Sequence, residues 1–113
     1  MTTTWADELA FAMDLARRAG AVLLDSYERV ETIDYKSKRD VVTDVDFRSE
    51  ELVLEAIRRE HPTDAILAEE SGKHESKAGG RGAQRLWIVD PLDGTVNYAN
   101  GIPYYCVSIG LVV

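Results

Sequence analysis

The chain has 113 residues, of which 45% are hydrophobic, and its formal net charge is −7. This length allows one small domain with a modest core, and the negative charge argues against a nucleic acid polymer or an anionic membrane surface as the main partner. The N-terminus has neither a basic region nor a long apolar run, and no segment approaches the length of a membrane span, so we expect no signal peptide and a cytoplasmic protein.

Two amphipathic helices are predicted in the first half of the chain. Apolar residues recur at spacings of three and four from Trp5 to Tyr27, and Thr4 is expected to cap this helix. A short strand at 32–35 and a polar turn at 36–39 follow. The next helix begins after Thr43 and stops at 61–62, where a proline follows a histidine.

Short strands separated by polar segments are predicted in the second half. We expect strands at 65–68, 86–89 and 103–113, and a mobile loop at 71–85 because that glycine-rich segment has no hydrophobic period. The last strand is apolar on nearly both faces, so it should be covered on both sides. The sequence therefore predicts an α+β fold that forms the front part of a larger domain.

Two carboxylates stand where the predicted strand 86–89 ends. Asp90 is followed by Pro91, and Asp93 by Gly94 and Thr95. Carboxylates at a strand end, followed by backbone N–H groups, suit a hard cation and the phosphate that the cation binds. The alternative is a plain turn, since these are also common turn residues.

The full run Trp87–Tyr98, WIVDPLDGTVNY, resembles the signature of the inositol monophosphatase family of magnesium-dependent, lithium-sensitive phosphatases. In that signature an aromatic and an aliphatic residue lead into D-P-aliphatic-D-G-[ST], with an aromatic three residues further on. Lys36, the D-x-V-T-x-x-D run at 40–46 and E-E-S at 69–71 precede it in the family's order. The resemblance implies the layered α/β sandwich of the inositol monophosphatase/fructose-1,6-bisphosphatase superfamily. Residues 1–113 would be its N-terminal portion, with two helices packed on a mostly antiparallel sheet.

The resemblance also implies a set of metal ligands. Glu70 would bind the first metal, Asp90 would bridge two metals, Asp93 would bind the second, and Leu92 would contribute its backbone carbonyl. Glu69 alternates to the other side of its strand and is expected to support the site from outside or to face solvent. All these donors are oxygen atoms, which favours Mg²⁺ over zinc.

Asp46 has two possible roles. Thr43 and Asp46 have the spacing of a capping box at the start of the second helix. The resemblance instead pairs Asp46 with Thr95, as a dyad that orients and deprotonates the attacking water. The two roles compete for one carboxylate, and we favour the dyad. The resemblance further implies that residues 92–95 contact the substrate, that the N–H groups of Gly94 and Thr95 face phosphate oxygens, and that Lys36 lies near the metal site.

The implied reaction is Mg²⁺-dependent hydrolysis of a phosphate monoester, with inositol 1-phosphate as the first candidate. Relatives that act on fructose 1,6-bisphosphate, histidinol phosphate or nucleotide 3′-phosphates share this metal core and stay open, as does a non-catalytic metal-binding fragment. The expected partners are a small phosphate ester and, for a full-length protein, a second copy. Cys106 is predicted to be a small core residue.

Overall fold

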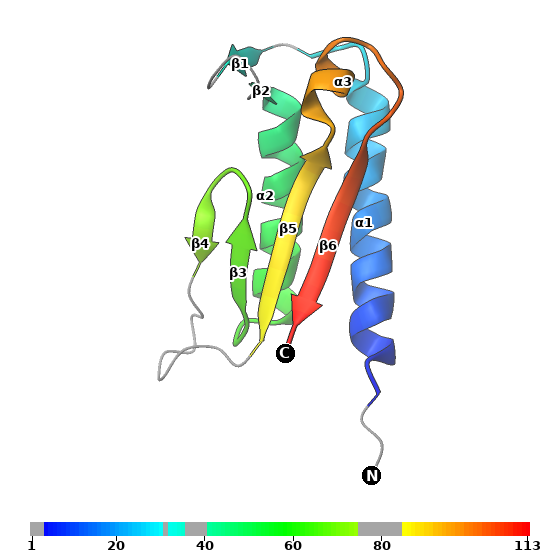
Figure 1. The fold of residues 1–113 in the computed structure, drawn as a ribbon. Coiled ribbons are helices and arrows are strands. Elements are labelled where there is room, and N and C mark those ends of the chain that lie inside the picture. Colours follow the sequence, from blue (N-terminus) through cyan, green and yellow to red (C-terminus); the bar gives the residue numbers. More distant parts are fainter. Residues whose placement is uncertain (1–3, 31, 36–40, 75–84) are drawn as a thin grey trace.

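A computed structural model describes residues 4–30, 32–35, 41–74 and 85–113 of the chain, so Lys36 and residues 75–84 lie outside the described residues. The chain alternates helices and strands (Figure 1). The elements are α1 (Ala6–Ser26), β1 (Ile33–Tyr35), β2 (Val41–Thr43), α2 (Asp44–Glu60), β3 (Ala65–Ala68), β4 (Gly72–His74), β5 (Leu86–Asp93), α3 (Thr95–Ala99) and β6 (Cys106–Val112).

Four strands form the main sheet, in the order β4-β3-β5-β6. β3 runs parallel to β5, whereas β4 and β6 are antiparallel to their neighbours. β1 and β2 form a separate antiparallel pair near the start of α2. The predicted α+β class and the mostly antiparallel pairing are therefore confirmed.

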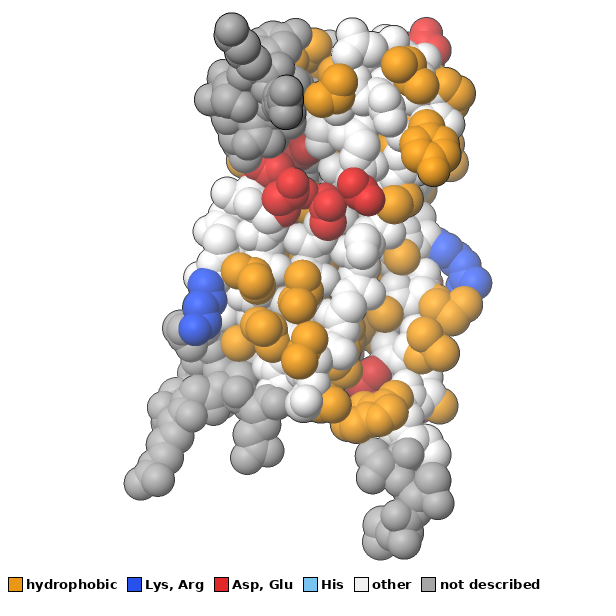
Figure 2. All heavy atoms as spheres, viewed as in Figure 1, with side chains coloured by type: hydrophobic (Ala, Val, Ile, Leu, Met, Phe, Trp, Pro, Cys, Tyr) orange, Lys and Arg blue, Asp and Glu red, His pale blue; other side chains and the backbone are white. Residues whose placement is uncertain are grey.

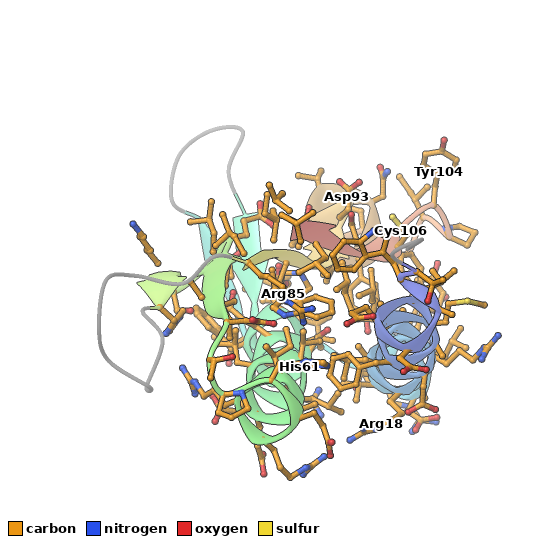
Figure 3. The ribbon with its side chains drawn as sticks, turned by 90° about the horizontal axis from the view of Figure 1, so that it is seen from below. Arg18, His61, Arg85, Asp93, Tyr104 and Cys106 are labelled. Carbon is orange, nitrogen blue, oxygen red and sulfur yellow. The ribbon has the colours of Figure 1, made fainter. Side chains whose placement is uncertain are left out.

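Both long helices cover the same face of the sheet. Figure 1 shows α1 and α2 side by side behind the strands, and Figure 3, seen from below, shows both on one side of them. Leu15 from α1, Ile57 from α2 and Trp87 from β5 are fully buried between these layers. The other face of the sheet is uncovered within the described residues, and Leu67 and Ile88 are 43% and 42% exposed there.

An ion-pair cluster holds the beginning of β5. The Arg85 guanidinium lies 2.8 Å from Asp64 Oδ2 and 3.0 Å from Glu8 Oε2, and the indole N–H of Trp87 donates to Asp64 Oδ2 at 2.9 Å. The hydrogen bond and the charge of Arg85 lower the pKa of Glu8. The ring of His61 packs against Trp87, and Figure 3 labels it beside Arg85. This cluster ties α1 to the sheet.

Several local predictions need correction. α1 begins at Ala6 after Trp5 with no side-chain cap, so the predicted Thr4 cap is wrong. The first part of the predicted loop 71–85 forms β4, because Gly72, with φ of 82°, reverses the chain and allows pairing with β3. Cys106 is exposed, not in the core, since it lies on the uncovered face of β6.

The predicted helix after Thr43 is confirmed, whereas β6 is covered on one face only within the described residues. Val107, Ile109 and Leu111 pack toward the core, and the residues between them are exposed. Among the described residues, none of the helices combines the length and the apolar character needed to cross a membrane.

Candidate active site

Glu69 and Asp90 lie side by side at the carboxyl ends of two parallel strands. Ala68 pairs with Val89, and the Glu69 N–H donates to the Val89 carbonyl at 3.0 Å. Side chains alternate along a strand, so Glu69 shares the uncovered face with Leu67, and Asp90 shares it with Ile88. Figure 2 shows acidic side chains gathered on this face, above a hydrophobic area.

The contact with Asp90 disfavours the ionised form of the Glu69 carboxyl group. The hydrogen bond with Asp90, together with partial burial and the negative charges of Asp90, Glu70 and Asp46, raises the pKa of Glu69 to about 8. Two ionised carboxylates in contact repel each other, so keeping one protonated relieves the repulsion. The raised pKa of Glu69 therefore favours its protonated form at neutral pH.

Glu69 was expected to support the site from outside or to face solvent, and its side chain is exposed and hydrogen-bonded to Asp90. The Glu70 N–H donates to Oε1 of the buried Glu50 at 3.0 Å, which anchors the end of β3 to α2. The charge of Glu70 also raises the pKa of Glu69, so Glu70 belongs to the same acidic region. The two-residue strand period, counted from Leu67 and matched to Asp90, is the sequence signal that identifies Glu69.

The turn after Asp90 is held by short polar contacts. Ser49 Oγ on α2 donates to the Pro91 carbonyl at 2.8 Å, and Asp90 Oδ1 accepts from the Leu92 N–H at 3.3 Å. The pairing of β5 with β6 is irregular between Asp90 and Asp93, where the proline cannot donate a ladder hydrogen bond. This irregularity shapes the segment that carries both aspartates.

Gly94 is required where the turn passes into α3. Its φ is 94°, and a Cβ built there would lie 2.8 Å from the backbone oxygen of Tyr104. Any other residue would have to adopt a left-handed conformation and displace backbone. The glycine therefore sets the position of Thr95 at the start of α3.

Asp46 makes the contacts that both of its predicted roles would need, to Thr43 and to Thr95. Its Oδ2 accepts from the Thr43 hydroxyl at 2.6 Å and from the Thr43 N–H at 3.0 Å, which completes the capping box of α2. Its Oδ1 accepts from the Thr95 hydroxyl at 2.9 Å. The expectation that the cap and the dyad compete is thus wrong, because they use different oxygens.

Burial makes Asp46 a stronger base than an exposed aspartate. The side chain is 0% exposed, and this desolvation raises its pKa, while the hydrogen bonds from Thr43 and Thr95 act in the opposite direction. The Thr95 Oγ also lies 3.0 Å from the Leu92 carbonyl oxygen. A hydroxyl has one proton, so Thr95 donates to Asp46 or to Leu92 at any moment, not to both.

Asp93 lies at the rim of the acidic region, beside Cys106. Asp93 pairs with Cys106 across β5 and β6, and its Oδ2 lies 3.8 Å from the thiol sulfur. Figure 3 labels both residues on these adjacent strands. Partial burial and the charge of Asp93 raise the pKa of Cys106. No sequence signal marks a thiol at this site, because Cys106 stands in an apolar run.

The donor set fits a hard cation, although its side chains have not converged. In the part of the chain that the structure describes, no group of three or more His, Cys, Asp or Glu side chains is arranged to hold a metal ion. The sequence-predicted donors Asp90, Leu92 and Asp93 follow one another at the strand end, and Glu69 joins Asp90. A divalent cation bound here would displace the proton that the raised pKa of Glu69 favours.

The chain is similar to known proteins over most of its length. The model of the inositol monophosphatase family matches residues 5–113. "Nus factor SuhB" of Pseudomonas aeruginosa is 43% identical over 103 residues, which cover 89% of this chain and 37% of that protein. "Fructose-1,6-bisphosphatase/inositol-1-monophosphatase" of Thermotoga maritima is 35% identical over 107 residues, 94% of this chain and 39% of that protein.

The chain is also similar to a solved structure. The inositol monophosphatase from Anabaena (Nostoc) sp. PCC 7120 is 43% identical, with a TM-score of 0.76 over 98% of this chain and 37% of that chain. The chain thus spans less than half the length of the relatives that it matches.

Proposed function

Because the chain belongs to the inositol monophosphatase family, we propose that it carries the metal-binding and water-activating part of a Mg²⁺-dependent phosphatase that hydrolyses phosphate monoesters. The contact of 2.9 Å between Thr95 Oγ and Asp46 Oδ1 carries this proposal. It joins a hydroxyl group to a buried carboxylate next to the acidic strand end. That combination suits the removal of a proton from water.

The attacking water would lose its proton to the Thr95 hydroxyl group, as the hydroxyl proton passes to Asp46. When Thr95 donates its hydroxyl proton to Asp46, the lone pairs of Oγ are left to accept a proton from water. The water oxygen then attacks phosphorus, the bond to the ester oxygen breaks, and the leaving alkoxide takes a proton from solvent while Asp46 returns its proton to solvent. The raised pKa of Asp46 favours this transfer, because a more basic carboxylate accepts a proton more readily.

The cation would be Mg²⁺, held by Asp90, Asp93 and the Leu92 carbonyl together with a glutamate. The contact between Glu69 and Asp90 favours Glu69 for that position, and Glu70 remains the candidate from the sequence resemblance. Bound Mg²⁺ supplies a water of lowered pKa and neutralises phosphate charge. Asp93, Gly94 and Thr95 would face the phosphate group.

The short chain would be a weak catalyst by itself. The resemblance implies a further carboxylate ligand in a tryptophan-aspartate motif, and the 113 residues contain no such dipeptide. We therefore expect residues 1–113 to be the N-terminal portion of one domain. Activity, lithium sensitivity and formation of a homodimer would need the length of the relatives.

Inositol 1-phosphate is the substrate that we favour, with fructose 1,6-bisphosphate, histidinol phosphate and nucleotide 3′-phosphates as alternatives. The name "Nus factor SuhB" of the Pseudomonas aeruginosa relative indicates a second candidate, a role as a Nus factor. The negative net charge of −7 favours a small ester over a nucleic acid polymer as the direct ligand. Failure of a longer chain to release phosphate would favour the second candidate.

Phosphate release by a chain extended to the relatives' length tests the dyad. Thr95→Val removes the hydroxyl at nearly constant volume and is expected to lower kcat by about 100-fold or more. Thr95→Ser keeps the hydroxyl and is the matched control, with most of the rate retained. Equal rates for the Thr95→Val and Thr95→Ser variants would show that the Thr95 hydroxyl does not take part.

Calorimetry on the 113-residue chain tests the cation site. Mg²⁺ is expected to bind weakly to the wild type, and Asp90→Asn should abolish the heat, because a bridging carboxylate is lost. Asp25→Asn makes the same change of charge on the exposed part of α1 and should leave the binding unaltered. Identical heats for wild type and Asp90→Asn would exclude Asp90 as a ligand.

A further inference from the structure

A polar cavity lies at the far end of α2 from Asp46. It has a volume of about 470 Å³ and lies between the end of α2 and the β3–β4 hairpin. The residues that line it are Arg58, His61, Pro62, Asp64, Ile66, Lys73 and His74. Asp46 and Arg58 are 12 positions apart on one helix, so about 18 Å separates the cavity from the dyad.

Arg58 brings a positive charge into this cavity that its partner does not neutralise. Its Nη2 lies 3.0 Å from Nδ1 of His74, whose Nε2 lies 2.6 Å from Ser71 Oγ. A guanidinium can only donate, so Nδ1 accepts and the His74 proton sits on Nε2, directed at Ser71. With that tautomer His74 is neutral, and Arg58 keeps its full charge.

The one acidic side chain among the described residues of the lining is bound elsewhere. Asp64 accepts from Arg85 Nη2 at 2.8 Å and from the Trp87 indole at 2.9 Å, so its charge is balanced within the ion-pair cluster. Lys73 adds a second basic residue to the lining. The carbonyl groups at the end of α2 oppose an anion, and Arg58 in the last turn offsets them.

We propose that this cavity binds a small ligand with a phosphate group, through the guanidinium of Arg58. A planar guanidinium matches two oxygens of a phosphate group, and His74 holds it in one orientation. The volume exceeds that of inorganic phosphate and leaves room for the organic part of a small ester.

An NMR titration of the ¹⁵N-labelled 113-residue chain with inorganic phosphate tests the proposal. The chelator EDTA is present, so that no cation supports phosphate binding at Asp90 and Asp93, and ionic strength is held constant with NaCl. We expect the largest saturable shifts at the backbone amides of Arg58, Lys73 and His74. Shifts confined to Gly94 and Thr95, or no saturable shifts, would overturn the proposal without affecting the proposed catalytic function.

Matched variants identify the side chain responsible. Arg58→Gln should weaken phosphate binding at least tenfold. Arg59→Gln makes the same change one residue further along, at an exposed side chain that pairs with Glu60 at 3.5 Å, and should leave the affinity unchanged. His74→Gln, on the β3–β4 hairpin, should weaken binding at least threefold and decides the matter if Arg58→Gln does not fold. Equal losses in the Arg58 and Arg59 variants, or unchanged affinity in the His74 variant, would contradict a built site.

Discussion

The two ends of β5 carry polar clusters of opposite character. At its beginning, Arg85 lies between Asp64 and Glu8, so opposite charges alternate and each carboxylate has a cationic partner. At its end, the charged groups that act on Glu69 are Asp90, Glu70 and Asp46, and all of them are acidic. The first arrangement stabilises the fold by itself, whereas the second is relieved by a proton or by a cation.

This difference separates a structural ion pair from a candidate functional site. Both clusters contain perturbed carboxyl groups, but the pKa of Glu8 is lowered by Arg85 and that of Glu69 is raised by Asp90. A lowered pKa marks a carboxylate that already has its counter-charge. A raised pKa marks one that still lacks it, which is the condition that favours metal binding.

The largest effect on the free energy of unfolding is expected at the beginning of β5, where the ion-pair cluster lies. Asp64→Ala should lower the free energy of unfolding by about 3 kcal/mol, because Arg85 loses its closest partner and the buried Trp87 N–H loses its acceptor. Urea denaturation followed by tryptophan fluorescence measures this loss. Glu60→Ala, at an exposed ion pair with Arg59, should change stability by less than about 0.5 kcal/mol. A similar small change in both variants would show that the ion-pair cluster contributes little.

At the end of β5, the contact that we expect to stabilise the fold is the uncharged hydrogen bond from Ser49 to the Pro91 carbonyl. Ser49→Ala leaves the Pro91 carbonyl without its donor and should cost about 1–2 kcal/mol. Ser108→Ala, on the exposed face of β6, is the matched control and should be nearly neutral. An equally neutral Ser49→Ala would mean that the turn after Asp90 is held by the backbone alone.

The elements with a strong hydrophobic period were predictable from the sequence. The helix that follows Thr43 was confirmed, because burial on one side fixes the period. β4 was missed because a three-residue strand has too few residues to show alternation. Cys106 was misassigned because the apolar run around it does not reveal which face of the sheet is covered.

The candidate site was only partly predictable, for a different reason. The positions of Asp46 and Thr95 came from the family resemblance, and their contact is present at 2.9 Å. Which glutamate contacts Asp90 depends on the register between β3 and β5, and register is a pairing of distant segments. The shared use of Asp46 for cap and dyad likewise depends on the orientation of its two oxygens, which no spacing specifies.

A pH dependence of stability should reveal the proton on Glu69. The pKa of Glu69 is about 8 in the folded chain and near 4.5 when unfolded. Between these values the folded chain binds more protons than the unfolded chain, so the free energy of unfolding should fall as pH rises from about 4.5 to about 8. Glu69→Gln cannot ionise and should remove this contribution, which urea denaturation in EDTA at several pH values would show.

Added Mg²⁺ sharpens the same experiment. A cation that replaces the proton should bind more tightly as pH rises toward 8, because less work is then needed to ionise Glu69. The stabilisation by Mg²⁺ should therefore increase over the range in which the metal-free chain loses stability. A stabilisation by Mg²⁺ that is independent of pH would argue that Glu69 is not among the ligands.

The smallest effect is expected at the rim of the acidic region. Burial and the charge of Asp93 raise the pKa of Cys106, so the exposed thiol should react slowly with iodoacetamide at neutral pH. Asp93→Asn removes the charge while keeping the shape, and the rate should rise severalfold because more thiolate is present. Iodoacetamide is uncharged, so the change cannot come from attraction of the reagent. Asp25→Asn, on α1, should leave the rate unchanged, since general charge effects over that distance are screened by salt. An unaltered rate in Asp93→Asn would leave burial and the charge of Asp90 as the causes of the raised pKa of Cys106, and would remove Asp93 from the acidic end of β5.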